Sequence, residues 1–269
     1  MRFAIAYSKK DEAAINIINQ FKKIAFAPDM PIIELRKDSI YSEDLNEKNY
    51  PELRNIDFLV FASKHKSKEG SPSLSLHAPG NFRNADFGGK SGKICNTSAF
   101  VLKYLFQQLN KNANESEELK NKYQITLECT HHGPLIEIPC CFIELGSSEK
   151  QWSEEEPAKI LAKTILSLKD YESQPNWIPC IGIGGPHYCP NFNKIQLNSE
   201  YAIGHIMPEY ALPLTNIILK EAEQKTTEQI KQIILDWKGL GKSEERQKTI
   251  NLLNQFGFKH IRTNNIKYQ

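Results

Sequence analysis

The chain alternates between apolar, strand-like runs and stretches with helical periodicity, and this alternation limits its fold more than any other feature. The strand-like runs are at residues 2–8, 32–35, 57–62, 124–129, 138–145, 177–183 and 201–207, with a short one near His260. The helical stretches are at residues 11–23, 98–109, 154–168, 213–223, 226–237 and 244–256. Strands that are almost continuously apolar and alternate with helices are typical of a parallel sheet covered on both faces. The sequence therefore predicts a three-layer α/β/α fold with a largely parallel, mixed central sheet.

One long segment departs from this alternation. Residues 64–92 are rich in serine and glycine and show no convincing periodic element. A loop of this length in a compact domain is usually a binding loop or a disordered one. Leu74, Leu76, Phe82 and Phe87 offer apolar anchors, which favours the binding loop. We therefore expect a single α/β domain spanning residues 1–269, with a long functional loop at about 64–92.

Composition places few limits on function. Lysine and arginine together number 34 against 32 acidic residues, so the formal net charge is +2, which neither requires nor excludes a nucleic-acid partner. No apolar run approaches the ~20 residues that a transmembrane helix needs, and the apolar N-terminal run is too short for a signal peptide. These features predict a cytoplasmic protein with no membrane association.

Two histidine-bearing segments follow apolar, strand-like runs. They are Glu128-Cys-Thr-His-His-Gly-Pro134 and Gly182-Ile-Gly-Gly-Pro-His-Tyr-Cys-Pro190. In α/β proteins, ligands bind where strands give way to loops, because the sheet holds these loops in place. Histidine is also the side chain best suited to proton transfer and metal ligation near neutral pH. The two segments therefore predict an active site.

Five histidines share this setting beside glycine or proline, at or just past an apolar run: His77, His131, His132, His187 and His205. We leave out His65, which lies in a lysine-rich loop, and His260, which lies near the C-terminus. On an extended strand His131 and His132 would point to opposite faces, whereas both would face the cleft if a turn began at Thr130. The sequence leaves these two arrangements open.

Carboxylates and glycines accompany the histidines. Glu128 lies three residues before His131, and Glu144 interrupts an apolar strand, where it would need a partner. Each could orient an imidazole, bind a metal or act as a general base, and a structural ion pair is the alternative. The glycines of the second segment lack the spacing of a phosphate-binding loop. We expect them either to let the backbone come close to a ligand or to stabilise an oxyanion through their backbone amides. They are Gly182, Gly184 and Gly185.

These segments, with Glu144-Leu-Gly-Ser-Ser148 and Gly204-His-Ile206, resemble the archaeal and plant type of D-aminoacyl-tRNA deacylase. Ser75-x-His77-x-Pro-Gly-Asn81 and Trp237-Lys-Gly-Leu240 are also similar to that family. The motifs occur in the family's order and cover residues 1 to about 262. Pro186 and Cys189 depart from the glycine and the small residue that we expect beside His187.

The resemblance implies an enzyme that hydrolyses the ester bond of D-aminoacyl-tRNA, releasing free tRNA and the D-amino acid. It also implies zinc dependence and a fold similar to peptidyl-tRNA hydrolases and nucleoside phosphorylases. Catalysis would then fall to His131, His132, Glu128 and Glu144. The metal ligands would be His77, His187 and His205, with His131 and His132 as further candidates.

The implied substrate needs a surface for RNA. Lys238, Lys242 and Arg246 are candidates for phosphate contacts. An ordinary solvated surface is an equally good interpretation of each. Two alternatives remain open: a hydrolase or phosphorylase of the same fold acting on a small metabolite, and a non-catalytic RNA-binding protein. The sequence does not decide between a monomer and a homodimer.

Overall fold

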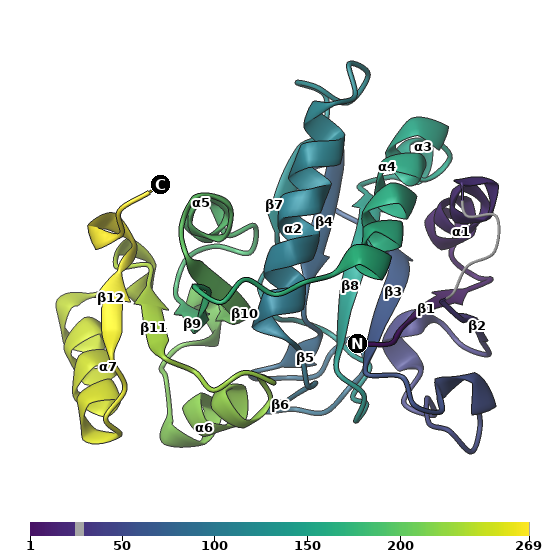
Figure 1. Ribbon diagram of the computed structural model, residues 1–269. Coiled ribbons are helices and arrows are strands. Elements are labelled where there is room, and N and C mark those ends of the chain that lie inside the picture. Colours follow the sequence, from purple (N-terminus) through teal and green to yellow (C-terminus); the bar gives the residue numbers. More distant parts are fainter. Residues whose placement is uncertain (25–29, 269) are drawn as a thin grey trace.

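The computed structural model describes residues 1–24 and 30–268, in which two largely parallel sheets flank one long helix (Figure 1). The larger sheet has the strand order β2-β1-β3-β8-β4-β7. Its strands are β1 (Phe3–Ser8), β2 (Ile32–Leu35), β3 (Phe58–Lys64), β4 (Ser73–His77), β7 (Gln124–Leu127) and β8 (Cys140–Gly146). Only the pairing of β4 with β8 is antiparallel in this sheet. The predicted α/β fold with a largely parallel, mixed sheet is confirmed.

The smaller sheet is entirely parallel and has the order β10-β9-β11-β12. Its strands are β9 (Ile178–Ile183), β10 (Tyr201–Met207), β11 (Gln232–Leu235) and β12 (His260–Arg262). A two-stranded ribbon joins β5 (Gly80–Asn81) to β6 (Lys93–Ile94). The predicted strands are therefore divided between two sheets, and the cavity described below lies among their loops.

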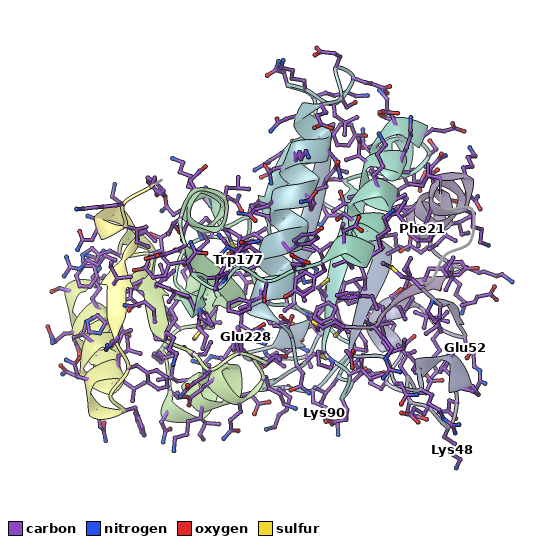
Figure 2. All side chains as sticks on the ribbon, viewed as in Figure 1. Phe21, Lys48, Glu52, Lys90, Trp177 and Glu228 are labelled. Carbon is purple, nitrogen blue, oxygen red and sulfur yellow. The ribbon has the colours of Figure 1, made fainter. Side chains whose placement is uncertain are left out.

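Helices cover one face of the larger sheet (Figure 1). These are α1 (Glu12–Ile24), α2 (Ala99–Asn114) and α4 (Glu155–Leu166), with the short α3 (Glu149–Trp152) beside them. Their apolar residues, including the fully buried Phe21 of α1 (Figure 2), pack with Phe58 and Val60 of β3. Leu59 of β3 points to the opposite face, because successive side chains of a strand alternate. There it meets Leu53, from the segment between β2 and β3, so both faces of the sheet are covered.

Helix α2 connects the two sheets, since it packs against β4 and β7 on one side and β10 on the other. Its first turn leaves backbone N–H groups without helical partners. The Ser98 side chain accepts a hydrogen bond from Val101, and the Glu228 carboxylate accepts one from the Ala99 N–H at 2.8 Å (Figure 2). Glu228 lies just before β11, so this cap also fixes the smaller sheet to the helix. The remaining helices are α5 (Pro190–Asn198), α6 (Asn216–Gln224) and α7 (Ser243–Gln255).

The helix predicted at residues 226–237 is wrong, because β11 occupies this segment. Ile233 and Ile234 are both fully buried, and they belong to different core clusters on opposite faces of the smaller sheet. A strand buried on both faces is apolar at successive positions, and such a run also satisfies a helical template. The β-branched isoleucines favour the strand.

The 64–92 segment was wrongly interpreted as one uninterrupted loop. It contains β4, whose residues are all buried between β7 and β8. The alternation in Ser73-Leu-Ser-Leu-His77 is a strand pattern that the surrounding serines and glycines obscured. The part of the segment after β5 does remain irregular, and it borders the cavity.

Among residues 1–24 and 30–268, no helix is both long enough and apolar enough to cross a membrane. The single-domain organisation, the cytoplasmic location and the oligomeric state stay predictions.

Candidate functional site

A cavity of ≈ 630 Å³ lies where loops of the two sheets meet, and four of the predicted site residues line it. His131 and His132 follow β7, Glu144 lies within β8, and His187 follows β9. The cavity is lined by these four residues and by others that include His65, Lys64, Lys66, Arg83, Phe87 and Tyr210. Its size is typical of a site for a small organic group.

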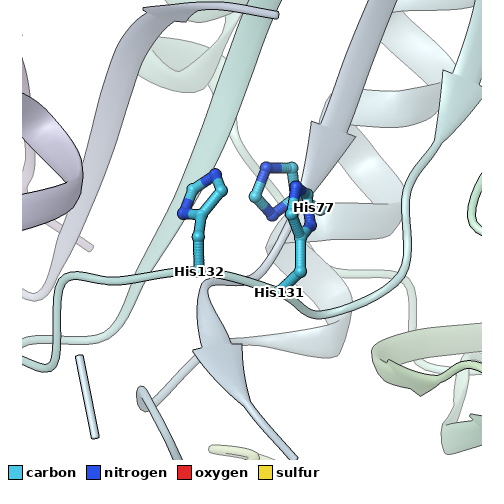
Figure 3. Close-up of side chains that lie close together, drawn as sticks. All are labelled: His77, His131 and His132. Atoms are coloured by element: carbon cyan, nitrogen blue, oxygen red, sulfur yellow. The ribbon is translucent and has the colours of Figure 1, made fainter. Parts of the chain in front are cut away.

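Three imidazoles stand together in this site (Figure 3). The ring of His77, at the end of β4, lies 4.2 Å from that of His131 and 4.8 Å from that of His132, between centroids. The rings of His131 and His132 are 4.3 Å apart. His77 is fully buried behind the other two, which border the cavity. The structure thus brings together three of the five predicted histidines in one cluster, which we call the histidine triplet.

The backbone explains how neighbouring residues can both face the cluster. His132 adopts a left-handed conformation with φ of 43°, so the chain leaves the extended geometry at this residue. In an extended strand its ring would point away from that of His131. Non-glycine residues rarely adopt this conformation, and those that do are enriched at functional sites. Of the two arrangements that the sequence left open, the structure has the one in which both rings face the site.

Each ring of the histidine triplet is oriented by a backbone carbonyl oxygen. Nδ1 lies 3.2 Å from the oxygen of Ala78 for His77, 2.8 Å from that of Cys129 for His131, and 2.6 Å from that of Gly133 for His132. A carbonyl oxygen only accepts, so Nδ1 carries the hydrogen in each ring. The lone pair therefore remains on Nε2, the nitrogen through which a neutral imidazole binds a metal.

The pKa values of His131 and His132 agree with neutral rings. Burial and the neighbouring His77 hold the pKa of His131 well below its usual range. Burial, again with His77, lowers the pKa of His132 to about 4. Both rings are therefore neutral at pH 7. Nε2 of His77 is buried and has no hydrogen-bond partner among the described residues, which leaves its lone pair unused.

A second group forms around the carboxylate of Glu128, which is fully buried. Nε2 of His187 donates to Oε2 of Glu128 at 2.9 Å, and Nδ1 of His65 lies 3.1 Å from Oε1. Burial opposes ionisation of Glu128, but these two imidazoles hold its pKa well below the usual range. Burial also disfavours the charged rings, yet the carboxylates raise the pKa of His65 to about 11, and Cys129 and Glu128 raise that of His187 to about 10.

Glu144 lies between the two groups. Its Oε2 is 3.5 Å from Nδ1 of His65, and its Oε1 is 3.9 Å from Nε2 of both His77 and His132. Burial favours the neutral acid, but hydrogen bonding to His65 lowers the pKa of Glu144 to about 2. The site therefore combines neutral imidazoles with buried carboxylates whose charge is balanced by protonated ones.

Comparison with known proteins identifies the family. Residues 52–261 match the model of the family described as D-aminoacyl-tRNA deacylase. The D-aminoacyl-tRNA deacylase of Pyrococcus abyssi is 32% identical to the chain over 275 residues, which cover 96% of this chain and 98% of that protein. The chain belongs to the D-aminoacyl-tRNA deacylase family. The resemblance inferred from the sequence motifs is thereby confirmed.

Two further comparisons agree. The D-aminoacyl-tRNA deacylase of Methanocaldococcus jannaschii is 32% identical over 92% of this chain and 94% of its own. The crystal structure of a conserved protein of unknown function matches with a TM-score of 0.89 and 26% identity, and covers 99% of this chain and 96% of that one. The sequence match and the fold match therefore each cover more than nine tenths of the chain.

Sequence reasoning missed His65, which the structure places at the centre of the site. Besides its contacts with both carboxylates, its Nε2 lies 3.0 Å from the hydroxyl of Tyr188. The neighbouring lysines suggested a solvated loop, but the residue is 6% exposed. The available signal was its position directly after the buried strand β3, although, unlike the other histidines, it has no neighbouring glycine or proline.

His205, predicted as a metal ligand, lies outside both groups. Its Nδ1 is 3.1 Å from the hydroxyl oxygen of Thr130, and its Nε2 is 3.3 Å from the carbonyl oxygen of Lys225. It is fully buried in β10, and burial lowers its pKa to about 4. Because both ring nitrogens contact protein groups, His205 positions the Thr130 segment and does not extend to the cavity.

The predicted oxyanion glycines are also outside the cavity lining. Gly182 lies within β9, and the N–H of Gly184 donates to the carbonyl oxygen of Met207 at 2.8 Å. Gly184 and Gly185 have φ of 94° and 83° and pack against Asp236 and Gly239, where a Cβ atom would collide. These glycines therefore allow close backbone packing, and their role toward a ligand or an oxyanion stays a prediction.

The predicted phosphate-binding residues lie at the start of α7 and just before it. Lys238 and Lys242 are exposed. The guanidinium of Arg246 lies 5.2 Å from the centre of the Trp237 ring, and that of Arg262 lies 3.5 Å from it. None of the three predicted residues lines the cavity, so a contact with RNA there would involve a part of tRNA remote from the reacting ester.

The ion pairs of Glu128 lead to a pH prediction. Replacing Glu128 by glutamine removes the negative charge that His65 and His187 share, so the pKa values of both imidazoles should fall from about 11 and about 10. Imidazole titration by NMR in metal-free protein measures this change. The exposed Glu137→Gln is the control and should leave both pKa values unchanged; unchanged values in Glu128→Gln would contradict the pairing.

The same pairs link stability to pH. The folded-state pKa of His187, about 10, lies above its ordinary value of 6.5. Its stabilising charge is therefore fully present below pH 6.5 and is lost as the pH rises through about 10. Glu128→Gln should weaken this loss of stability at alkaline pH.

Proposed function

We propose that this protein hydrolyses the ester bond of D-aminoacyl-tRNA and releases free tRNA and the D-amino acid, which removes mischarged tRNA from translation. Membership of the D-aminoacyl-tRNA deacylase family carries this proposal. The site supports it, because neutral imidazoles, buried carboxylates and a cavity for a small acyl group occur together. No observation favours a small-metabolite hydrolase, a phosphorylase or a non-catalytic RNA-binding protein.

We further propose that the histidine triplet binds zinc. His77, His131 and His132 each offer one ring nitrogen as a ligand, and these three nitrogens lie within 4.8 Å of one another. Nε2 of His77, which has no hydrogen-bond partner among the described residues, fits this role. The backbone carbonyl oxygens also fit it, because they keep the hydrogen on Nδ1 and orient each ring, and zinc binds a neutral, oriented imidazole. A bound zinc would supply Lewis acidity and lower the pKa of a bound water to about 7.

The carboxylates and the protonated imidazoles have separate roles in this proposal. His187 borders the cavity, and its hydrogen bond to the Glu128 carboxylate keeps a proton on Nε2. The positively charged ring would stabilise negative charge developing on the acyl oxygen. Glu144 also borders the cavity, is ionised, and lies 3.9 Å from two nitrogens of the triplet. We assign it the role of accepting a proton from the attacking water.

The direct test of the proposed function compares two substrates. D-tyrosyl-tRNA and L-tyrosyl-tRNA are incubated separately with the purified protein, and the release of tyrosine is followed. We expect hydrolysis of the D-ester to be faster by roughly 100-fold or more, since proofreading requires discrimination. Equal rates for both esters, or rates equal to the uncatalysed ones, would reject the proposal.

Zinc binding is tested by metal content as well as by activity. We expect the wild-type protein to retain zinc through gel filtration, and His77→Ala to lose it, because the buried ring has no equivalent replacement. Elemental analysis of both proteins gives the answer without reference to catalysis. His260→Ala, which alters a histidine outside the site, is the control and should retain the metal. Equal zinc in wild type and His77→Ala would exclude the triplet, and full deacylation by verified metal-free protein would exclude a role of zinc in the reaction.

We propose that Lys238, Lys242 and Arg246 contact tRNA phosphates. If so, changing all three to glutamine should flatten the dependence of log Kd on log salt by roughly 2, since each lost phosphate contact contributes about 0.7–0.9. Filter binding of uncharged tRNA at several salt concentrations measures the slope. The triple variant Lys23→Gln, Lys48→Gln and Lys111→Gln alters exposed lysines elsewhere and serves as the control. Equal slopes in both variants would show that the three residues do not contact tRNA.

A further inference from the structure

Two large aromatic side chains are exposed at the cavity that holds the histidine triplet. Phe87 is 64% exposed and Tyr210 is 63% exposed, and both line this cavity. Phe87 comes from the irregular segment after β5, and Tyr210 from the short 3₁₀ helix Glu209–Ala211 after β10. Single exposed apolar residues are common on protein surfaces, but aromatic rings gathered at a cavity are typical of a binding site.

The ring of Tyr210 is held in place at its tip. Its hydroxyl lies 3.0 Å from Sγ of Cys129 and 3.4 Å from Nδ1 of His187, while most of the residue is open to solvent. Cys129 is fully buried beside the triplet. The ring is thereby fixed next to the reacting groups before any ligand binds, which lowers the entropic cost of stacking on it.

The segment that carries Phe87 is fixed as well. The carbonyl oxygen of Phe87 accepts a hydrogen bond from the N–H of Gly133 at 2.8 Å, directly after His132. Arg83, on the same segment, donates through Nε to the carbonyl oxygen of Ala211 at 2.8 Å. Arg83 therefore ties the segment of Phe87 to the turn of Tyr210, so the two rings border one opening.

The chemistry of this opening favours an unpaired base. Proteins recognise single-stranded ends of RNA by stacking the bases on aromatic rings, and this stacking contributes about 1–3 kcal/mol per base. Lys64 and Lys66 line the same cavity and can accompany a phosphate, but Asp38 and Asp86 line it too, so its charge is mixed. The aromatic rings, and not the net charge, distinguish the opening.

We propose that Phe87 and Tyr210 form a stacking platform for the terminal adenine of tRNA, which places the ester of the attached amino acid at the histidine triplet. This proposal rests on the deacylase function proposed above. It assigns to these two residues a substrate-binding role separate from the chemistry.

The test measures binding of adenosine 5′-monophosphate to the full-length protein, which requires no catalysis. Isothermal titration or ligand-observed NMR gives its Kd for the wild type and for Phe87→Ala, Phe87→Leu, Phe87→Trp and Tyr210→Ala. Ile217→Ala, which removes another exposed apolar side chain, on α6 and outside the cavity lining, is the control. Ribose 5-phosphate is the probe without a base.

We expect Phe87→Ala and Tyr210→Ala to raise the Kd for adenosine 5′-monophosphate roughly 10-fold, within the range of one lost stacking contact. Phe87→Leu should weaken binding nearly as much, because it keeps apolar area but has no aromatic face, whereas Phe87→Trp and Ile217→Ala should bind as the wild type does. Equal Kd values for wild type and Phe87→Ala, or ribose 5-phosphate binding as tightly as the nucleotide, would overturn the platform. Stacking-dependent binding by a protein that fails to hydrolyse D-tyrosyl-tRNA would support the platform and reject only the deacylase function.

Discussion

Burial of two carboxylates imposes the strongest constraint on this site. A buried, unpaired carboxylate is strongly destabilising, so Glu128 and Glu144 require partners that can carry positive charge. Nε2 of His187, 2.9 Å from Glu128, and Nδ1 of His65, between the two carboxylates, provide them. Because these partners come from loops after β3 and β9, neutralising the carboxylates also fastens the larger sheet to the smaller one. The architecture of the cavity follows from this pairing.

The same constraint divides the imidazoles into two kinds. Those that touch Glu128 closely, His65 and His187, are held in the protonated state. His131 and His132, whose Nδ1 atoms face backbone carbonyl oxygens, are neutral and keep a lone pair on Nε2. Both kinds can serve ester hydrolysis, because positive charge stabilises the developing oxyanion while neutral nitrogen binds a metal or accepts a proton. The two protonation states of the imidazoles therefore follow from their contacts with the carboxylates and with backbone carbonyl oxygens.

Local patterns in the sequence predicted much of this protein, and their failures have physical causes. Most of the strands and helices were predicted because their apolar periodicity is strong, and His131 was found because it follows a strand. β11 (Gln232–Leu235) was mistaken for part of a helix, since burial on both faces removes the alternation that identifies a strand. His65 was missed because its lysine neighbours are exposed while its own ring turns inward to carboxylates that are distant in the sequence. Contacts of this kind depend on the tertiary fold.

We propose that the lone pairs of the histidine triplet form a zinc site at this cavity. Its most direct test is a crystal of the purified protein, with diffraction recorded on both sides of the zinc absorption edge. We predict an anomalous peak about 2.0–2.1 Å from Nε2 of His77, His131 and His132, the distance at which zinc binds imidazole nitrogen. A zinc peak held by other residues, or no peak in protein crystallised with excess zinc, would contradict this account.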